Sequence, residues 1–141
     1  MDKSLNNIKE IKLKIFQNKK GNILRGFRKS KSIKFPFSEI YFSRIKYNKI
    51  KGWKYHTKMT MELFVPIGKV KFIFFDENKE QFKEIIIGEK NYKKIIVPPK
   101  IWFSFKGLSK IESLVVNMAD IIHRKKESKN IPLNKIKYKF K

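Results

Sequence analysis

Two side chains that can carry or stabilise a charge lie close together in the segment Lys49–His56. His56 is one of only two histidines, and Lys54 precedes it on the same side of a strand, where alternate side chains share a face. Histidine titrates near neutral pH and can take a proton, whereas lysine attracts phosphates and carboxylates. The pair therefore predicts either a pocket for proton transfer beside a carbonyl or an edge-strand histidine among solvated lysines.

Aromatic side chains near this segment add a second possibility. Large rings can stack on a nucleotide base or a sugar ring, although the same residue types commonly fill a core. The candidates are Tyr41, Trp53, Tyr55 and Trp102. Both interpretations stay open for each of them.

Several other kinds of site lack the residues that they need. The chain has no cysteine and only His56 and His123 as histidines, so a zinc site would depend on carboxylates such as Glu62. No glycine-rich phosphate loop and no serine-triad motif occurs. We therefore expect no metal and no cofactor.

The net charge of +23 resembles that of nucleic-acid-binding proteins. However, only Arg25, Arg28, Arg44 and Arg124 among the 35 basic residues are arginine, the residue best suited to forked contacts with phosphate and guanine. The lysines are also spread over the whole chain, together with many isoleucines and asparagines, as in proteins of AT-rich genomes. The charge favours anionic ligands in general, and nucleic acid is the less favoured partner.

Short runs of β-forming residues, separated by turn signals, must position these side chains. They lie at 11–16, 23–27, 39–45, 49–56, 61–66, 70–75, 82–87, 94–97, 101–105 and 113–118. This spacing is typical of an all-β sandwich or barrel. We expect a single domain over 1–141, with a core at about 10–120 and a charged C-terminal segment, 121–141, that contains a short helical turn at 131–136.

No apolar run reaches the roughly 18 residues of a membrane span, and the first residues do not resemble a signal peptide. We therefore expect a cytoplasmic protein without a membrane span.

Three segments together resemble the dTDP-4-dehydrorhamnose 3,5-epimerase family, whose members are jelly rolls of the cupin type that act on nucleotide sugars. Residues 51–56, Lys-Gly-Trp-Lys-Tyr-His, resemble the family's Arg-Gly-Leu-His-Tyr-Gln. Residues 65–76 and 96–105 are similar to two later strands of the family. The resemblance covers about residues 18–136 and implies an all-β, cupin-type jelly roll with a nucleotide-sugar ligand.

The chain departs from this family at the residues that perform its chemistry. The resemblance places Lys54 at the catalytic-base histidine, Val116 at the acid tyrosine, Phe103 at a second pocket histidine and Met61 near a pocket lysine. The carboxylate that orients the base histidine in the family comes from a C-terminal part that this chain lacks or has rewritten. The usual pair of catalytic residues is therefore absent.

Lys20 and Lys51 occupy the positions of the family's phosphate-binding arginines, which implies a role in holding the diphosphate. Lysine keeps the charge at these positions but not the forked geometry of arginine.

A divergent, epimerase-like branch of the same superfamily is more similar. Its motifs match Lys51–His56, Met59-Thr60, Val65–Gly68, Val97–Trp102 and Asn117–His123. Proteins of this branch belong to surface-polysaccharide pathways, lipopolysaccharide among them. The resemblance implies a nucleotide-sugar ligand and adds Asn117 and His123 to the candidate pocket residues.

Three functions remain open. In the first, the protein is a nucleotide-sugar epimerase or isomerase in which His56 is the base, Lys54 stabilises an enolate oxygen, and His123 or Asp120 handles the second proton. In the second, the protein binds a sugar or nucleotide sugar without catalysis, and in the third it is a basic nucleic-acid-binding barrel. Because the family is dimeric, we also expect a homodimer in which the N-terminal strand pairs or exchanges between subunits.

Overall fold

Strands dominate the regular structure of the described residues, 5–29 and 36–140, in this computed structural model. The strands are β1 (Lys9–Lys12), β2 (Ile15–Phe16), β3 (Ile23–Leu24), β4 (Glu39–Ile45), β5 (Ile50–His56), β6 (Met61–Ile67), β7 (Lys69–Asp76), β8 (Gln81–Gly88), β9 (Lys93–Val97), β10 (Trp102–Gly107), β11 (Ser113–Ala119) and β12 (Ser128–Asn130). Three 3₁₀ turns accompany them: η1 (Leu5–Asn7), η2 (Lys125–Glu127) and η3 (Leu133–Lys135). These ranges contain no α-helix.

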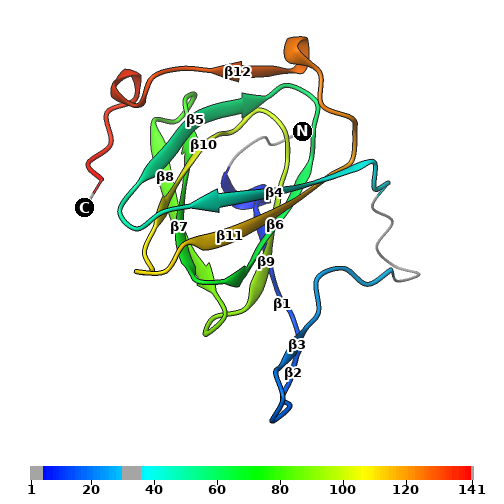
Figure 1. Cartoon of the computed structure of the whole chain (residues 1–141). Helices are drawn as coiled ribbons and strands as arrows, with labels where there is room; N and C mark the ends of the chain where they lie inside the picture. The colour runs from blue at the N-terminus through cyan, green and yellow to red at the C-terminus, as the bar shows by residue number, and fades with distance from the viewer. Residues whose placement is uncertain (1–4, 30–35, 141) are drawn as a thin grey trace.

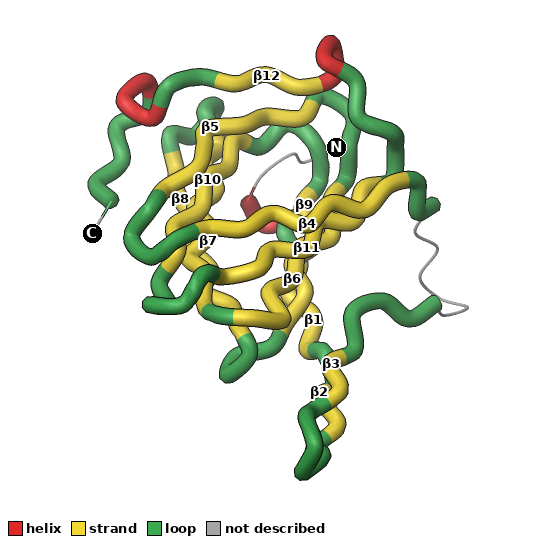
Figure 2. Tube along the Cα trace, in the orientation of Figure 1, coloured by secondary structure: helices red, strands yellow, loops and turns green. Residues whose placement is uncertain are grey.

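Two five-stranded antiparallel sheets build the barrel (Figure 1). The first, sheet A, has the strand order β1-β9-β6-β11-β4, and the second, sheet C, has the order β12-β5-β10-β7-β8. Strands that are distant in sequence thus lie side by side, and yellow strands surround the centre in Figure 2. The all-β jelly roll that the sequence predicts is confirmed.

Alternating apolar side chains of the central strands form the main core. Leu63 and Val65 of β6, and Phe72 and Phe74 of β7, are each at most 1% exposed and belong to one cluster. Full burial of such a side chain contributes about 1.5–3 kcal/mol. This core holds the two sheets at a fixed separation and so fixes the space that remains between them.

The outer face of sheet A carries a second apolar cluster. Phe64, Tyr92, Val116 and Met118 form it, and Leu24 packs against them. Leu24 belongs to the β2–β3 hairpin, which projects from the barrel in Figure 1. The sequence predicts one strand over 11–16, but β1 ends at Lys12 and β2 begins at Ile15. The break lets the chain leave the sheet edge and enter the hairpin.

The outer face of sheet C is covered by residues 128–140, here named the C-terminal segment. Its strand β12 pairs with β5, and the backbones of Trp53 and Ile131 exchange two hydrogen bonds of 3.1 Å. The indole of Trp53 is fully buried, donates to the Leu133 carbonyl at 3.2 Å, and packs against Tyr138 and Phe140. The predicted helical turn corresponds to η3.

Gly52 allows β5 to approach β10 closely. Its φ is +144°, and a Cβ atom there would run into Ser104, beside a register shift between Phe103 and Ser104. A side chain at this position would push the two strands apart. Glycine therefore keeps Lys51 and Lys54, on either side of it, at the wall of the space between the sheets.

Candidate active site

A pocket of about 470 Å³ opens between the two sheets, and we call it the barrel pocket. Strands β4, β5, β6, β10 and β11 contribute its walls, and the chain after β11 forms part of its rim. It is lined by Tyr41, Phe42, Ser43, Lys51, Gly52, Lys54, His56, Met59, Leu63, Phe103, Phe105, Val115, Asn117, His123 and Asn130. The shared face expected for Lys54 and His56 is therefore found, and it faces this pocket.

His56 is paired with a carboxylate that the sequence analysis did not identify. Its Nδ1 lies 2.6 Å from Oε1 of Glu127, and both side chains are only 5% exposed. The other carboxylate oxygen, Oε2, accepts hydrogen bonds from the backbone N–H groups of Lys58 at 3.0 Å and Met59 at 2.9 Å. Glu127 is thus held by three donors, and the imidazole ring is held by Glu127.

The environment keeps His56 neutral and Glu127 ionised. Burial lowers the pKa of His56 below its ordinary value of 6.5, with a further lowering by the charges of Lys54 and His123, while Glu127 opposes this shift. Burial alone would raise the pKa of Glu127, but the hydrogen bonds from His56, Lys58 and Met59 outweigh it and lower that pKa. A neutral ring that donates from Nδ1 carries its lone pair on Nε2, which makes His56 a competent base.

Two buried polar atoms of the barrel pocket have no hydrogen-bond partner among the described residues. They are the hydroxyl oxygen of Tyr41 and Oδ1 of Asn117, and the amide nitrogen of Asn117 contacts Sδ of Met61 at 3.3 Å. Burial raises the pKa of Tyr41 to about 12, and the carboxylate of Glu39 adds to this effect. Because buried polar atoms normally find partners, a neutral hydroxyl donor and an amide acceptor are available here for a bound molecule.

Three cationic or titratable side chains lie at the walls of the pocket. Lys51 donates from Nζ to the Arg44 carbonyl at 2.7 Å and to Oγ of Ser43 at 3.2 Å, so it is tied to β4. His123 places its ring edge-on to Tyr41, with the ring centroids 6.3 Å apart. Lys54 makes the pocket more positive beside His56, which suits an anionic ligand.

Several of the residues singled out from the sequence do not line the barrel pocket. Lys20 lies in the turn of the β2–β3 hairpin, where its backbone N–H donates to Asn18. Trp53 is buried under the C-terminal segment, and Trp102 packs on Tyr55 on the same outer face of sheet C. The pleat of β5 explains the position of Trp53, since Trp53 and Tyr55 alternate with Lys54 and His56 along that strand.

Positions matched to the epimerase residues divide between the two faces of the sheets. Phe103 stacks on His56 with ring centroids 6.1 Å apart, so it takes part in the pocket wall. Val116 belongs to the outer cluster of sheet A, and its neighbour Asn117 reaches the pocket instead. The rewritten C-terminal part does supply a carboxylate, Glu127, which is the only acidic residue among residues 121–141 and could have been noticed for that reason.

Asp120, the alternative second proton group, accepts a hydrogen bond on Oδ1 from the backbone N–H of Thr60 at 2.9 Å and does not line the barrel pocket.

Within residues 5–29 and 36–140, no three metal-ligating side chains converge. No helix in the same ranges is long and apolar enough to cross a membrane.

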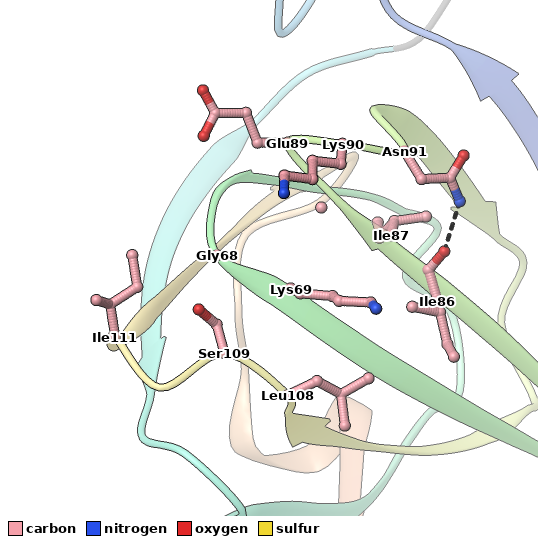
Figure 3. Close-up of a pocket in the computed structure, with 11 residues that line it drawn as sticks. Gly68, Lys69, Ile86, Ile87, Glu89, Lys90, Asn91, Leu108, Ser109 and Ile111 are labelled. Carbon is pink, nitrogen blue, oxygen red and sulfur yellow. Dashed lines mark hydrogen bonds between the residues drawn. The ribbon is translucent and has the colours of Figure 1, made fainter.

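A second pocket, of about 460 Å³, lies where the β6–β7, β8–β9 and β10–β11 turns meet, and we call it the turn pocket (Figure 3). Lys69, Lys90 and Glu89 are its charged residues, and Asn91 is already bonded to the Ile86 carbonyl at 2.7 Å. It contains no histidine. The groups suited to proton transfer are therefore gathered in the barrel pocket.

Comparison with known proteins finds a matching family model and similar solved structures. The model of a family described as FdtA, WxcM-like, C-terminal, matches residues 6–131. A dTDP sugar isomerase from Desulfovibrio desulfuricans G20 is similar with a TM-score of 0.88 and 27% identity, over 94% of this chain and 90% of that one. Among curated protein sequences no relative matches.

Two further structures share the fold at lower identity. QdtA, a sugar 3,4-ketoisomerase from Thermoanaerobacterium thermosaccharolyticum in complex with TDP, has a TM-score of 0.74 and 19% identity, over 89% of this chain and 88% of that one. A dTDP-4-dehydrorhamnose 3,5-epimerase from Bacillus anthracis str. Ames, with TDP and PPi bound, has a TM-score of 0.78 and 16% identity, over 91% and 80%. At such identities the likeness establishes the fold.

Proposed function

Because the chain belongs to the FdtA family (WxcM-like, C-terminal), we propose that it is a sugar-nucleotide isomerase that moves a proton at a carbon beside a ketone. The observation that carries this proposal is the buried hydrogen bond between His56 and Glu127 at the wall of the barrel pocket. It supplies a neutral, oriented imidazole, which is the group that such proton transfer requires.

The reaction begins when Nε2 of His56 takes a proton from the carbon next to the ketone. The electrons of that C–H bond form an enolate, and the ammonium group of Lys54 stabilises its oxygen. Delivery of a proton from a second group, His123, to the opposite face of the same carbon is an epimerisation, and His56 keeps the proton that it took until it exchanges with water. Return of the proton to the former carbonyl carbon, after a proton passes between the two oxygens, moves the ketone along the ring.

The remaining polar groups of the barrel pocket bind and orient the ligand in this proposal. The Tyr41 hydroxyl donates to a sugar oxygen, and Oδ1 of Asn117 accepts from a sugar hydroxyl, which satisfies two atoms that otherwise lack partners. Lys51 attracts the diphosphate at the pocket wall, and His123 at the rim returns the second proton. The substrate class is a dTDP-4-keto-6-deoxyhexose, and the pathway is surface-polysaccharide biosynthesis in the cytoplasm.

One observation favours a second candidate, a protein that binds nucleotide sugars without converting them. Lys54 stands where the resembled dTDP-4-dehydrorhamnose 3,5-epimerase family has its base histidine. Val116, on the outer face, stands where that family has its acid tyrosine. If His56 cannot take over as base, binding would persist without proton exchange.

We also propose a homodimer formed through the edges of sheet A. Strands β1 and β4 are these edges, and β4 exposes Ile40 by 40% and Phe42 by 65% on one face. Apolar side chains on an open edge favour pairing with a second copy. Light scattering after size exclusion, on the wild type and on Phe42→Lys, tests this arrangement.

The decisive experiment measures deuterium entry from D₂O into dTDP-4-keto-6-deoxyglucose by NMR. The wild type should exchange a proton beside the ketone, and His56→Gln should not, although dTDP still raises the melting temperature of both. Binding without exchange in the wild type would favour the second candidate. Neither binding nor exchange would reject this nucleotide-sugar assignment.

A further inference from the structure

A third cavity, a basic groove of about 580 Å³, lies behind the His56–Glu127 pair. It is formed by Ser38 just before β4, the loop after β5 and the chain from Ile121 to Glu127, and none of these lining residues lines the barrel pocket. Its lining includes four cationic side chains: Lys58, Arg124, Lys125 and Lys126. The turn pocket, in contrast, combines two lysines with Glu89.

The cations of the basic groove are not neutralised by ion pairs within the described residues. Among the described residues, Glu127 is the groove's only acidic lining residue, and its two oxygens are already engaged by His56, Lys58 and Met59. Two hydroxyl groups, of Ser38 and Thr57, complete the polar lining and donate to backbone carbonyls. Four unpaired cations around one concave surface favour an anion of high charge density.

The groove and the catalytic pair share one short stretch of chain. Lys125 and Lys126 belong to η2, the turn that ends in Glu127, and the backbone N–H of Lys58 donates to Glu127. Thr57 adds two hydrogen bonds of 2.8 Å to the Glu127 carbonyl, one from its N–H and one from its hydroxyl. An anion that contacts Lys58 and Lys126 would therefore tie η2 to the loop that holds the Glu127 carboxylate.

We propose that the basic groove binds a phosphate-bearing anion, and that the bound anion keeps Glu127 against His56. The binding part of this inference stands on the groove alone, whereas the effect on catalysis rests on the proposed function. The anion has two possible sources, free diphosphate and the diphosphate of a nucleotide. Through this site, phosphate compounds would act on the His56–Glu127 pair from outside the barrel pocket.

Binding of inorganic diphosphate, measured by calorimetry at constant ionic strength, tests the groove, since bulk screening is then equal in all titrations. The variant Lys58→Gln/Arg124→Gln removes two charges from the groove, and the matched variant Lys69→Gln/Lys90→Gln removes two from the turn pocket (Figure 3). We expect the first to weaken binding roughly tenfold or more and the second less than about twofold. Equal weakening in both variants, or no binding by the wild type, would overturn the proposal.

Competition with dTDP identifies the source of the anion. If dTDP displaces diphosphate, and the groove variant weakens both ligands, the groove receives the nucleotide's own diphosphate in place of Lys51. If both ligands bind together, the groove takes a free anion. Either result supports the site.

The effect of anion binding on the His56–Glu127 pair can be measured without catalysis. NMR of the His56 ring should show its titration moving to higher pH when diphosphate binds, because the anion and a fixed Glu127 both favour the protonated ring. Glu127, Lys54 and His123 are the charged groups that act on this ring, and Phe103 packs on it. In Glu127→Gln, diphosphate should still bind but produce a smaller shift.

An unchanged His56 titration in wild-type protein saturated with diphosphate would reject the coupling and leave the isomerase proposal intact. Loss of proton exchange with normal diphosphate binding would count against the isomerase proposal alone.

Discussion

The Nδ1 atom of His56 and the Oε1 atom of Glu127 lie 2.6 Å apart, although 71 positions separate the two residues in the chain. His56 ends β5, whereas Glu127 ends a 3₁₀ turn that the following strand, β12, ties to the edge of the same sheet. The pair depends on the C-terminal segment, because the segment fixes the turn that carries the carboxylate.

Replacement of Glu127 by glutamine should lower kcat by roughly 10²-fold or more, since the ring loses the partner that sets its tautomer. KM should change little, because Glu127 does not line the barrel pocket. The matched control is Glu112→Gln, which removes an exposed carboxylate paired with Arg44 at 3.4 Å. Similar losses in both variants would contradict a positioning role for Glu127.

The rate should fall on the acidic side as His56 becomes protonated. Burial lowers the pKa of His56 below 6.5, so kcat/KM should stay level as the pH falls to about that value and decrease only below it. In Glu127→Gln the decrease should begin at still lower pH, because Glu127 favours the protonated ring. A midpoint above 6.5 in the wild type would contradict this assignment.

The same shift predicts a loss of stability in acid. The unfolded chain takes up a proton on His56 below pH 6.5, whereas the folded chain resists it, so the free energy of unfolding should decrease as the pH falls below about that value. His56→Gln should show a weaker dependence in this range. Urea denaturation at several pH values measures the difference.

Removal of the Tyr41 hydroxyl should affect binding and stability in opposite directions. Tyr41→Phe deletes a buried oxygen without a partner, so the free protein should be equally or slightly more stable, while ligand binding should weaken by about 1–2 kcal/mol. Tyr47→Phe is the control, since Tyr47 is 41% exposed and lies outside the pocket. Thermal shifts with and without dTDP-sugar would show both effects, and unchanged binding would remove Tyr41 from the site.

Two glycines with similar backbone angles separate conformational strain from steric collision. Gly21 has φ of +137° with open space around it, whereas a Cβ on Gly52, at +144°, would meet Ser104. Gly21→Ala should lower the free energy of unfolding by about 1–3 kcal/mol through backbone strain alone, and Gly52→Ala should lower it clearly more. Equal losses would show that β5 can move away from β10.

The sequence predicts the strands well because alternation and turn residues are local signals. Lys54 and His56 share the pocket face for this reason, and the same alternation places Trp53 on the opposite face. The expectation that Trp53 stacks on a ligand came from residue type, which carries no information about the face. The resemblance to the epimerase family placed its acid tyrosine at Val116, but the pleat of β11 turns Val116 to the outer face and brings its neighbour Asn117 to the pocket.

Glu127 could not be placed from the sequence, because its contact with His56 depends on long-range folding. A highly charged segment without periodicity is typical of a solvated tail. Here Leu133, Ile136, Tyr138 and Phe140 are apolar positions within that segment, and they pack with Trp53 on sheet C. These scattered residues anchor the segment, although no local pattern indicated it.

The burial of Trp53 and Trp102 determines what fluorescence can report. They are the only two tryptophans of the chain, they are 0% and 8% exposed, and both lie in the cluster on the outer face of sheet C. Tryptophan emission should therefore be blue-shifted in the folded protein and move to the red when the C-terminal segment detaches. A sugar nucleotide that enters the barrel pocket would leave this emission nearly unchanged, so the intrinsic signal follows the C-terminal segment, which anchors the turn that carries Glu127, rather than the ligand.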